Sequence, residues 1–277
     1  MNRNFMRWPG FRRKALTLSY DDGTIYDKRL VEILNKSGIK CTFNLNSGSF
    51  GVGRRLSRED ALELFASSAH EVAVHGVYHL PLDRIPDPLV LNDILNDRIA
   101  LENAFDRLVQ GMAYAFGTYN DSVIEDLRRC GIKYARTVNA TSKFDLPSDW
   151  LRWDPTCHHR SACLTELVNE FLTDEGGKSY TSQKPSLFYL WGHSYEFNDA
   201  DNWSLIEEFA EKMGGHEDIW YATNMEVYRY TEAFDRLEYS ADGSMIYNPS
   251  AIDVYIRYFT NDYVIPAGAT VKVEPKR

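Results

Sequence analysis

Short apolar segments alternate with amphipathic segments from Ala15 to about Phe234. This alternation is typical of a repeating βα chain with a mostly parallel sheet. The predicted strands are 15–19, 41–45, 71–74, 112–115, 133–136, 186–191 and 218–222, with a weaker candidate at 151–153. The predicted helices are 28–37, 57–65, 89–108, 122–130, 165–172, 203–213 and a last helix that ends at Phe234. Seven or so such units predict an α/β fold, namely a complete or incomplete barrel.

After Phe234 the pattern changes to short strand-like segments separated by turn signals such as Asp242-Gly243 and Asn248-Pro249. Such a pattern is typical of hairpins. We therefore expect a barrel domain over residues 1–235 and a small β-rich C-terminal extension over residues 236–277. The extension either packs on the barrel or carries a binding surface, and its strongly apolar segments favour packing.

The 277-residue chain has a formal net charge of −9 and no run rich in Lys or Arg. This balance argues against nucleic acid and anionic membrane as partners and favours a neutral substrate. The chain shows no long uncharged apolar span and no apolar segment in its first ten residues, so we expect a cytoplasmic protein. Its 4 cysteines are too sparse for a disulfide scaffold. The oligomeric state stays open.

Titratable or metal-binding residues follow several predicted strands. They are Asp21 and Asp22, His75 and His79, Asp154, and His193. Working residues of α/β barrels lie at the carboxyl ends of the strands, where these ends meet. Each residue alone is weak evidence, but their joint placement predicts one active site.

His75 and His79 are four residues apart, so on one helical turn both imidazoles would point the same way. Together with one carboxylate they would leave open positions for water and substrate on a divalent metal ion. Zinc is the first expectation, and cobalt, nickel, manganese and iron are compatible with this ligand set. Of the adjacent carboxylates Asp21 and Asp22, one could ligate the metal while the other faces the attacking water.

Four segments resemble, in order, the motifs of the polysaccharide deacetylases, also called NodB-like proteins or carbohydrate esterase family four. They are Ser19-Tyr20-Asp21-Asp22-Gly23, His75-Gly76-Val77-Tyr78-His79, Ala113-Tyr114-Ala115-Phe116-Gly117 and Leu190-Trp191-Gly192-His193. The resemblance covers about residues 15–222. The first two motifs together are specific, whereas the last two are weak alone.

This resemblance implies a distorted (β/α)7 barrel that removes acetyl groups from N- or O-acetylated sugars. It implies that Asp21 is the general base and His193 the general acid, and that Asp22, His75 and His79 bind the metal. It also implies that the backbone N–H of Phe116 helps to hold the oxyanion. Tyr114 would lie beside the substrate, while Asp154, Trp153 and Trp191 would support the acid.

The chain departs from the family pattern at three places. Gly76 stands where the family has Ser or Thr, and Ala113 stands where the family has the arginine that pairs with the base. Either Arg136 or Arg152 could replace that arginine. The family's D-x-x-D-W segment has no clear copy, and Trp153-Asp154-Pro155 is the nearest candidate, with Asp154 supporting His193.

Several alternatives remain open. Cys157-His158-His159 with Cys163 is a competing but poorly spaced metal cluster. Tyr195 and Glu196 either touch substrate or cap the loop after His193. The protein could also hydrolyse a non-sugar amide or ureide on the same barrel, or bind carbohydrate without catalysis.

Overall fold

A curled parallel sheet forms the centre of the computed structural model, which describes residues 3–176 and 184–274. Along the sheet the strands lie in the order β6-β5-β4-β3-β2-β8-β7, and β9 also pairs with β2. Their bounds are β2 Lys14–Asp21, β3 Thr42–Leu45, β4 Glu71–Val74, β5 Gly111–Ala113, β6 Tyr134–Arg136, β7 Cys157–His158, β8 Ser186–Gly192 and β9 Ile219–Tyr221. Every residue of β2 and β8 is buried, as expected of parallel strands covered on both faces.

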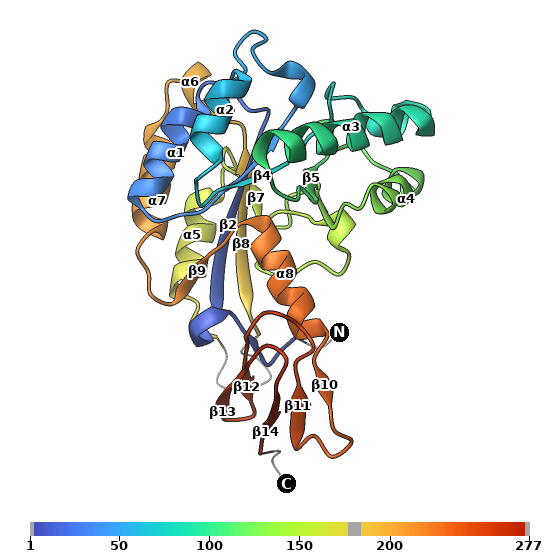
Figure 1. The fold of residues 1–277 in the computed structure, drawn as a ribbon. Helices are drawn as coiled ribbons and strands as arrows, with labels where there is room; N and C mark the ends of the chain where they lie inside the picture. Colours follow the sequence, from blue (N-terminus) through green and yellow to red (C-terminus); the bar gives the residue numbers. More distant parts are fainter. Residues whose placement is uncertain (1–2, 177–183, 275–277) are drawn as a thin grey trace.

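The segment from Trp153 to His158 joins the two edges of this sheet. Trp153 forms a parallel bridge with Arg136 at the end of β6, and Cys157 pairs with Leu190 of β8. Helices surround the sheet, with α1, α5 and α7 on one side of β2 and β8 in the view of Figure 1 and α3 and α4 on the other. The predicted distorted (β/α)7 barrel is therefore confirmed.

Eight α-helices lie within the described residues, and most coincide with the predicted ones. They are α1 Asp27–Lys36, α2 Arg58–Phe65, α3 Asp87–Phe105, α4 Asp121–Arg129, α5 Leu164–Thr173, α6 Ser194–Asp199, α7 Ser204–Met213 and α8 Asn224–Asp235. Side chains of Ser57, Asn120 and Thr223 accept backbone N–H groups in the first turns of α2, α4 and α8. Short 3₁₀ turns are η1 Pro9–Phe11, η2 Ser47–Ser49, η3 Leu82–Arg84, η4 Ala115–Gly117 and η5 Trp150–Arg152.

Three predicted details differ from the structure. The predicted strand 112–115 ends at Ala113, because the chain turns into η4. The weak strand candidate 151–153 is mostly the 3₁₀ turn η5, and the barrel strand of this region is β7. Helix α6 was not predicted. It is only 6 residues long, so it offers too few turns for a helical pattern to be recognised.

The C-terminal strands form two small sheets together with the N-terminus. β1 (Met6–Arg7) pairs with β12 (Val254–Tyr258), which pairs with β13 (Asn261–Ile265). The second sheet contains β10 (Glu238–Tyr239), β11 (Met245–Tyr247) and β14 (Thr270–Lys272). Residues 236–277 were predicted as a separate extension, and the structure adds β1 to that part of the molecule.

This β appendage packs against the barrel end where the strands begin. Ile246, Val254 and Ile256 share a buried cluster with Trp8 and Tyr230. Trp8 also donates to the carbonyl of Ser186 at the start of β8. Figure 1 shows the appendage at one end of the molecule and the loops that follow β2 and β4 at the other. The apolar segments of the appendage therefore serve packing, as their composition favoured.

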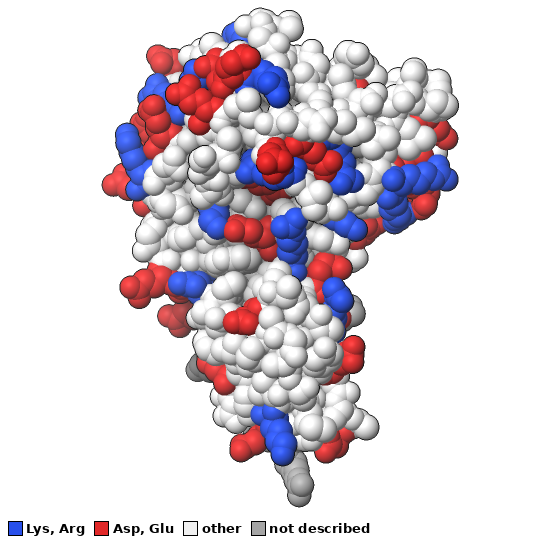
Figure 2. Space-filling model, viewed as in Figure 1, with Lys and Arg blue, Asp and Glu red and all other residues white. Residues whose placement is uncertain are grey.

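The surface view in Figure 2 shows Lys and Arg side chains mixed with Asp and Glu side chains over the barrel, whereas the appendage carries fewer charges on this face. No helix in residues 3–176 and 184–274 combines the length and the apolar character needed to cross a bilayer.

Candidate metal centre and active site

The carboxyl ends of three barrel strands bring five of the predicted residues together. Asp21 is the last residue of β2, and Asp22 follows it with a φ of 83°. His75 follows β4 and leads to His79, while His193 follows β8. Because these strands are parallel, their ends meet at the same edge of the sheet. A side chain with positive φ directly after a strand is a strained conformation of the kind found at functional sites.

Asp22, His75 and His79 form what we call the metal cluster. Their ligand atoms all lie within 4.8 Å of one another. Oδ1 of Asp22 is 3.8 Å from Nε2 of His75 and 3.6 Å from Nε2 of His79. The same oxygen is buried and has no hydrogen-bond partner within the described residues. A buried carboxylate oxygen without a partner is costly, so this atom is well suited to bind a cation.

The proton positions in the metal cluster also fit a metal ion. Nδ1 of His75 lies 2.8 Å from the carbonyl oxygen of Ala113, so it carries the proton and leaves the lone pair of Nε2 facing Asp22. Burial and the neighbouring His75 lower the pKa of His79 to about 4, so this ring is neutral at pH 7. Neutral imidazoles and one carboxylate are ligands that divalent metals such as zinc accept.

The loop from His75 to His79 is irregular, so the predicted helical turn is wrong. Gly76 has a φ of 81° and His79 a φ of 54°, and these two positions bend the loop so that the two imidazole rings lie 4.8 Å apart. A Cβ atom at Gly76 would overlap Oδ2 of Asp93. The other oxygen of Asp93 accepts the backbone N–H of Tyr78 at 2.9 Å. Glycine therefore replaces Ser or Thr here because Asp93 occupies the space of a side chain.

Arg136 is the charge partner of Asp21. Its Nη2 donates to Oδ2 of Asp21, and both side chains are buried. Burial alone would raise the pKa of Asp21, but the charge of Arg136 and smaller effects of the site histidines lower it to about 2. Arg152, the other predicted substitute for the motif arginine, pairs with Asp121 and Asp149 instead. The arginine missing at Ala113 is thus supplied from the next strand, β6.

Glu196, rather than Asp154, contacts His193. Oε2 of Glu196 lies 3.3 Å from both the backbone N and Nδ1 of His193. Asp154 instead accepts hydrogen bonds from Thr137 and Asn139. Burial lowers the pKa of His193, but the hydrogen bond to Glu196 and the charge of Asp21 outweigh burial, so this pKa lies above its ordinary value. The predicted support of His193 by Asp154 is therefore wrong.

Glu196 was missed as a partner because it stands three residues after His193, at the spacing of a helix cap. In the structure, Oε2 of Glu196 accepts the backbone N–H of His193, the residue before α6. The same geometry brings the carboxylate to the imidazole, so one residue both caps the helix and binds the ring. The spacing His193-Ser194-Tyr195-Glu196 was the available signal.

His158, His159 and Glu196 form a second group of possible metal ligands, which we call the Glu196 cluster. Oε2 of Glu196 lies 3.1 Å from Nε2 of His158 and 3.2 Å from Nε2 of His159. However, the backbone N–H of Arg160 donates to Nδ1 of His158 at 3.1 Å. That nitrogen therefore holds a lone pair, so the proton of the neutral ring sits on Nε2 and points at Glu196.

Within the Glu196 cluster the carboxylate bonds to His158, whereas the buried ring nitrogens of His159 have no hydrogen-bond partner among the described residues. Burial raises the pKa of Glu196, but its bonds to His158 and His193 outweigh burial and hold this pKa well below the ordinary value. Cys157 and Cys163, which the sequence offered as further ligands, are not part of the group. The competing Cys/His metal cluster does not form.

The predicted aromatic residues occupy different surroundings. Phe116, with a φ of 57°, places its exposed ring 4.4 Å from that of His79. Trp191 lies under the guanidinium of Arg136, with 4.2 Å between the Arg136 Cζ and the ring centroid. Tyr114 is buried and its hydroxyl donates to Leu151, while Trp153 packs against Tyr134 in the interior. Phe116 and Trp191 thus adjoin the site, whereas Tyr114 and Trp153 belong to the core.

Comparison with known protein families supports the motif resemblance. The family model described as polysaccharide deacetylase matches residues 10–135, which contain Asp21, Asp22, His75 and His79. His193 lies outside this match. No curated protein sequence is significantly similar to the chain.

Solved structures with this fold include a Mycobacterium smegmatis protein assigned as a polysaccharide deacetylase. Its TM-score is 0.58 at 16% identity, and the alignment covers 83% of this chain and 94% of that one. A family 4 carbohydrate esterase from Streptomyces lividans in complex with acetate has a TM-score of 0.50 at 13% identity, covering 76% and 92% of the two chains. These similarities show the fold.

The chain spans only part of another relative. The Streptococcus pyogenes deacetylase PplD in complex with acetate aligns at 21% identity with a TM-score of 0.45, over 49% of this chain and 61% of that one.

Proposed function

We propose that this protein is a metal-dependent hydrolase. Its residues 10–135 match the polysaccharide deacetylase family model, and its barrel has the fold of a solved structure assigned to that family. Its substrate would be an N- or O-acetylated saccharide, from which it removes acetyl groups as acetate. Asp22, His75 and His79 would hold the divalent metal ion. Once bound, that ion would polarise the acetyl carbonyl and make a water molecule more acidic.

Asp21 is assigned the role of general base. Its carboxylate is ionised at neutral pH because Arg136 lowers its pKa. Oδ2 of Asp21 lies 3.8 Å from Nε2 of His75, so a water molecule beside the metal cluster is within its reach. A base of such low pKa accepts a proton weakly. Its main contribution would then be to orient the water and to accept its proton, with the water made more acidic by a bound metal ion.

His193 is assigned the role of general acid. Glu196 accepts the Nδ1–H, so Nε2 faces the site and lies 3.9 Å from Oδ2 of Asp21. The raised pKa of His193 favours the protonated ring, which can donate to the leaving amine or alkoxide. The backbone N–H of Phe116 is the candidate oxyanion donor.

One observation carries this proposal: Asp22 offers a buried oxygen without a partner to two histidines, next to an ionised carboxylate and a protonatable imidazole. A catalytically silent carbohydrate-binding protein would have no need to keep these groups together.

The test combines a metal assay on the purified protein with acetate detection. Chitooligosaccharides, acetylxylan and small amides would be compared before and after treatment with a chelator. We expect about one divalent ion per chain and acetate release from at least one saccharide, lost on chelation and restored by metal. Turnover of small amides alone would show that the substrate is an amide and not a saccharide. Saccharide binding without turnover would refute the proposed enzymatic activity.

A further inference from the structure

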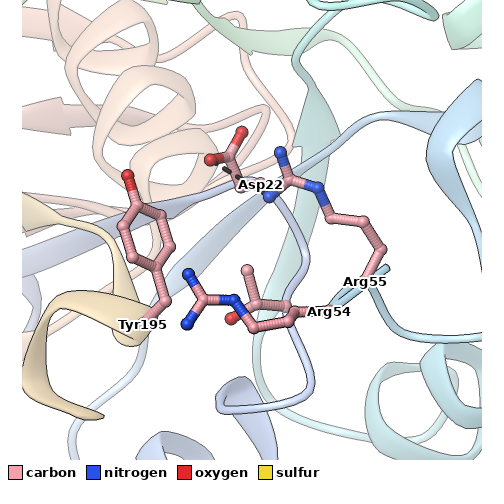
Figure 3. A pocket seen from close by; sticks show the side chains of 5 residues that line it. Asp22, Arg54, Arg55 and Tyr195 are labelled. Atoms are coloured by element: carbon pink, nitrogen blue, oxygen red, sulfur yellow. Dashed lines mark ion pairs between the residues drawn. The ribbon is translucent and has the colours of Figure 1, made fainter. Parts of the chain in front are cut away.

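A cavity of about 390 Å³ opens directly beside the metal cluster. It is lined by Asp22, Thr24, Arg54, Arg55 and Tyr195. Figure 3 shows the guanidinium groups of Arg54 and Arg55 around the same open space as the Asp22 carboxylate and the Tyr195 ring. None of the family motifs contains either arginine, so the proposed reaction leaves both without a role.

The backbone holds both arginines in place. Thr24 and Arg55 form an antiparallel bridge, and the N–H of Ile25 donates to the carbonyl of Arg54 at 2.9 Å. The N–H of Leu56 donates to the carbonyl of Gly23 at 2.8 Å. The loop that carries the arginines is therefore paired with the loop that follows Asp22. These main-chain bonds fix the backbone of both arginines relative to the segment that follows Asp22.

Arg55 has unused hydrogen-bonding capacity. Its side chain is 26% exposed, and Nη1 lies 3.1 Å from Oδ2 of Asp22. Among the described residues this is the only ion pair or hydrogen bond of the guanidinium. Since a guanidinium has five N–H donors, most of them remain available to a ligand. Asp22 can accept from Arg55 with one oxygen while the other faces His75 and His79.

Arg54 adds a second cation at the rim. Two of its nitrogens lie 2.6 and 3.1 Å from the carboxylate oxygens of Asp199. Both partners are about half exposed, so this pair is weak and can rearrange when a ligand enters. The guanidinium also lies 5.6 Å from the ring centroids of Tyr26 and Tyr195, which limit its movement.

The charges around the cavity favour an anion. Two guanidiniums and one carboxylate line the cavity, while Asp199, the partner of Arg54, lies outside the lining. Each arginine has one carboxylate partner, so a metal ion on Asp22 would make the net charge at the cavity positive. Guanidinium groups bind planar oxyanions with paired hydrogen bonds. An uncharged sugar would leave these donors without a matching acceptor.

We propose that this cavity binds a carboxylate carried by the substrate close to its acetyl group, so that the enzyme prefers acidic acetylated saccharides. The inference rests on the proposed function, since the acetyl group must lie at the metal cluster. Arg55 is the principal contact and Arg54 the second. The net charge of the chain favoured a neutral substrate, whereas this cavity favours an anionic one.

The test uses N-acetylated oligosaccharides that carry a carboxylate at C6 or on O3, each compared with its methyl ester. The ester keeps the position of the substituent and removes its charge, with one added methyl group. We expect kcat/KM for at least one acid to exceed that of its ester by about tenfold, with the ratio falling as salt is added. Calorimetry on the same pairs with metal-loaded protein would measure a matching difference in Kd.

Variants then locate the effect. Arg54→Gln and Arg55→Gln should each bring the ratio of acid to ester toward one, and Arg54→Lys should retain part of the preference through its charge. Arg128→Gln, which removes an equal charge from an exposed part of α4, should leave the ratio unchanged. Equal Kd and kcat/KM for every acid and its ester would overturn the inference. Failure of all pairs, and also of chitooligosaccharides and acetylxylan, to release acetate would overturn the proposed function, and the Kd comparison would still decide on the cavity.

Discussion

Two clusters of histidines and carboxylates lie at the same end of the barrel, yet their protons are arranged in opposite ways. In the metal cluster, Nδ1 of His75 donates to a carbonyl, so Nε2 offers a lone pair to the centre. In the Glu196 cluster, Nδ1 of His158 accepts a backbone N–H, so Nε2 offers a proton to the centre. Similar residue types would therefore form a cation site in one place and hold a carboxylate by hydrogen bonds in the other. The bond on the far side of each ring makes the difference.

The largest effect should come from the same substitution in each cluster. His79→Gln should reduce bound metal from about one ion per chain to nearly none and lower acetate release by roughly 10³-fold, because the metal supplies several kcal/mol of stabilisation. His158→Gln should leave the metal content unchanged. Elemental analysis after gel filtration measures both. Loss of metal from His158→Gln with retention in His79→Gln would reverse the assignment of the two clusters.

The second-largest effect is expected from a substitution of Asp21. Asp21→Asn should lower kcat by roughly 10²- to 10³-fold while metal content stays near that of the wild type, because the amide cannot accept the proton of the water. The variant also leaves the buried Arg136 without its charge partner, so thermal unfolding must be recorded to show that the protein is folded. A folded, metal-loaded Asp21→Asn protein with full activity would eliminate Asp21 as the base.

Glu196→Gln tests the Glu196 cluster itself. The carboxylate helps to raise the pKa of His193, and a general acid must be protonated. Activity should therefore fall as pH rises through this pKa, and the variant should move that alkaline limb of kcat to lower pH. We expect kcat to decrease by about 10- to 100-fold near neutral pH, since the acid remains but is held and charged less well.

Two results of this experiment would be informative. Unchanged metal content would agree with Glu196 acting through His193, whereas loss of metal would make Glu196 a ligand. Asp199→Asn, on the same short helix but 45% exposed, is the matched control and should keep the wild-type pH profile. An unshifted alkaline limb in Glu196→Gln would remove Glu196 from the positioning of His193.

The sequence was sufficient to predict which functional residues lie at the ends of long buried strands. β2 and β8 are recognisable from their apolar composition, and parallel strands place Asp21 and His193 at the same edge. The short β7 and α6 were missed because a few residues carry no periodicity. The choice of Arg136 over Arg152 depended on how the barrel closes at Trp153, which no local pattern encodes.

The N-terminal strand shows the same limit over a longer distance. Met6 pairs with Ile256, and such a contact between the two ends of the chain depends on tertiary packing rather than on neighbouring residues. The reason for a glycine at position 76 also depends on tertiary packing. The sequence shows that Gly76 stands where the family has Ser or Thr, but the reason is Asp93, which belongs to α3 and comes close to Gly76 only in the folded protein.

The smallest predicted effect compares the glycines beneath the two clusters. A Cβ at Gly76 would overlap Asp93 and must also adopt a φ of 81°, whereas a Cβ at Gly192 would overlap the ring of His159. Each alanine variant should lose about 1–3 kcal/mol of stability, measured by denaturant unfolding. Only Gly76→Ala should also weaken metal binding, because it moves the loop that carries His75 and His79. Equal metal affinity in both variants would mean that the loop after β4 does not set the geometry of the metal cluster.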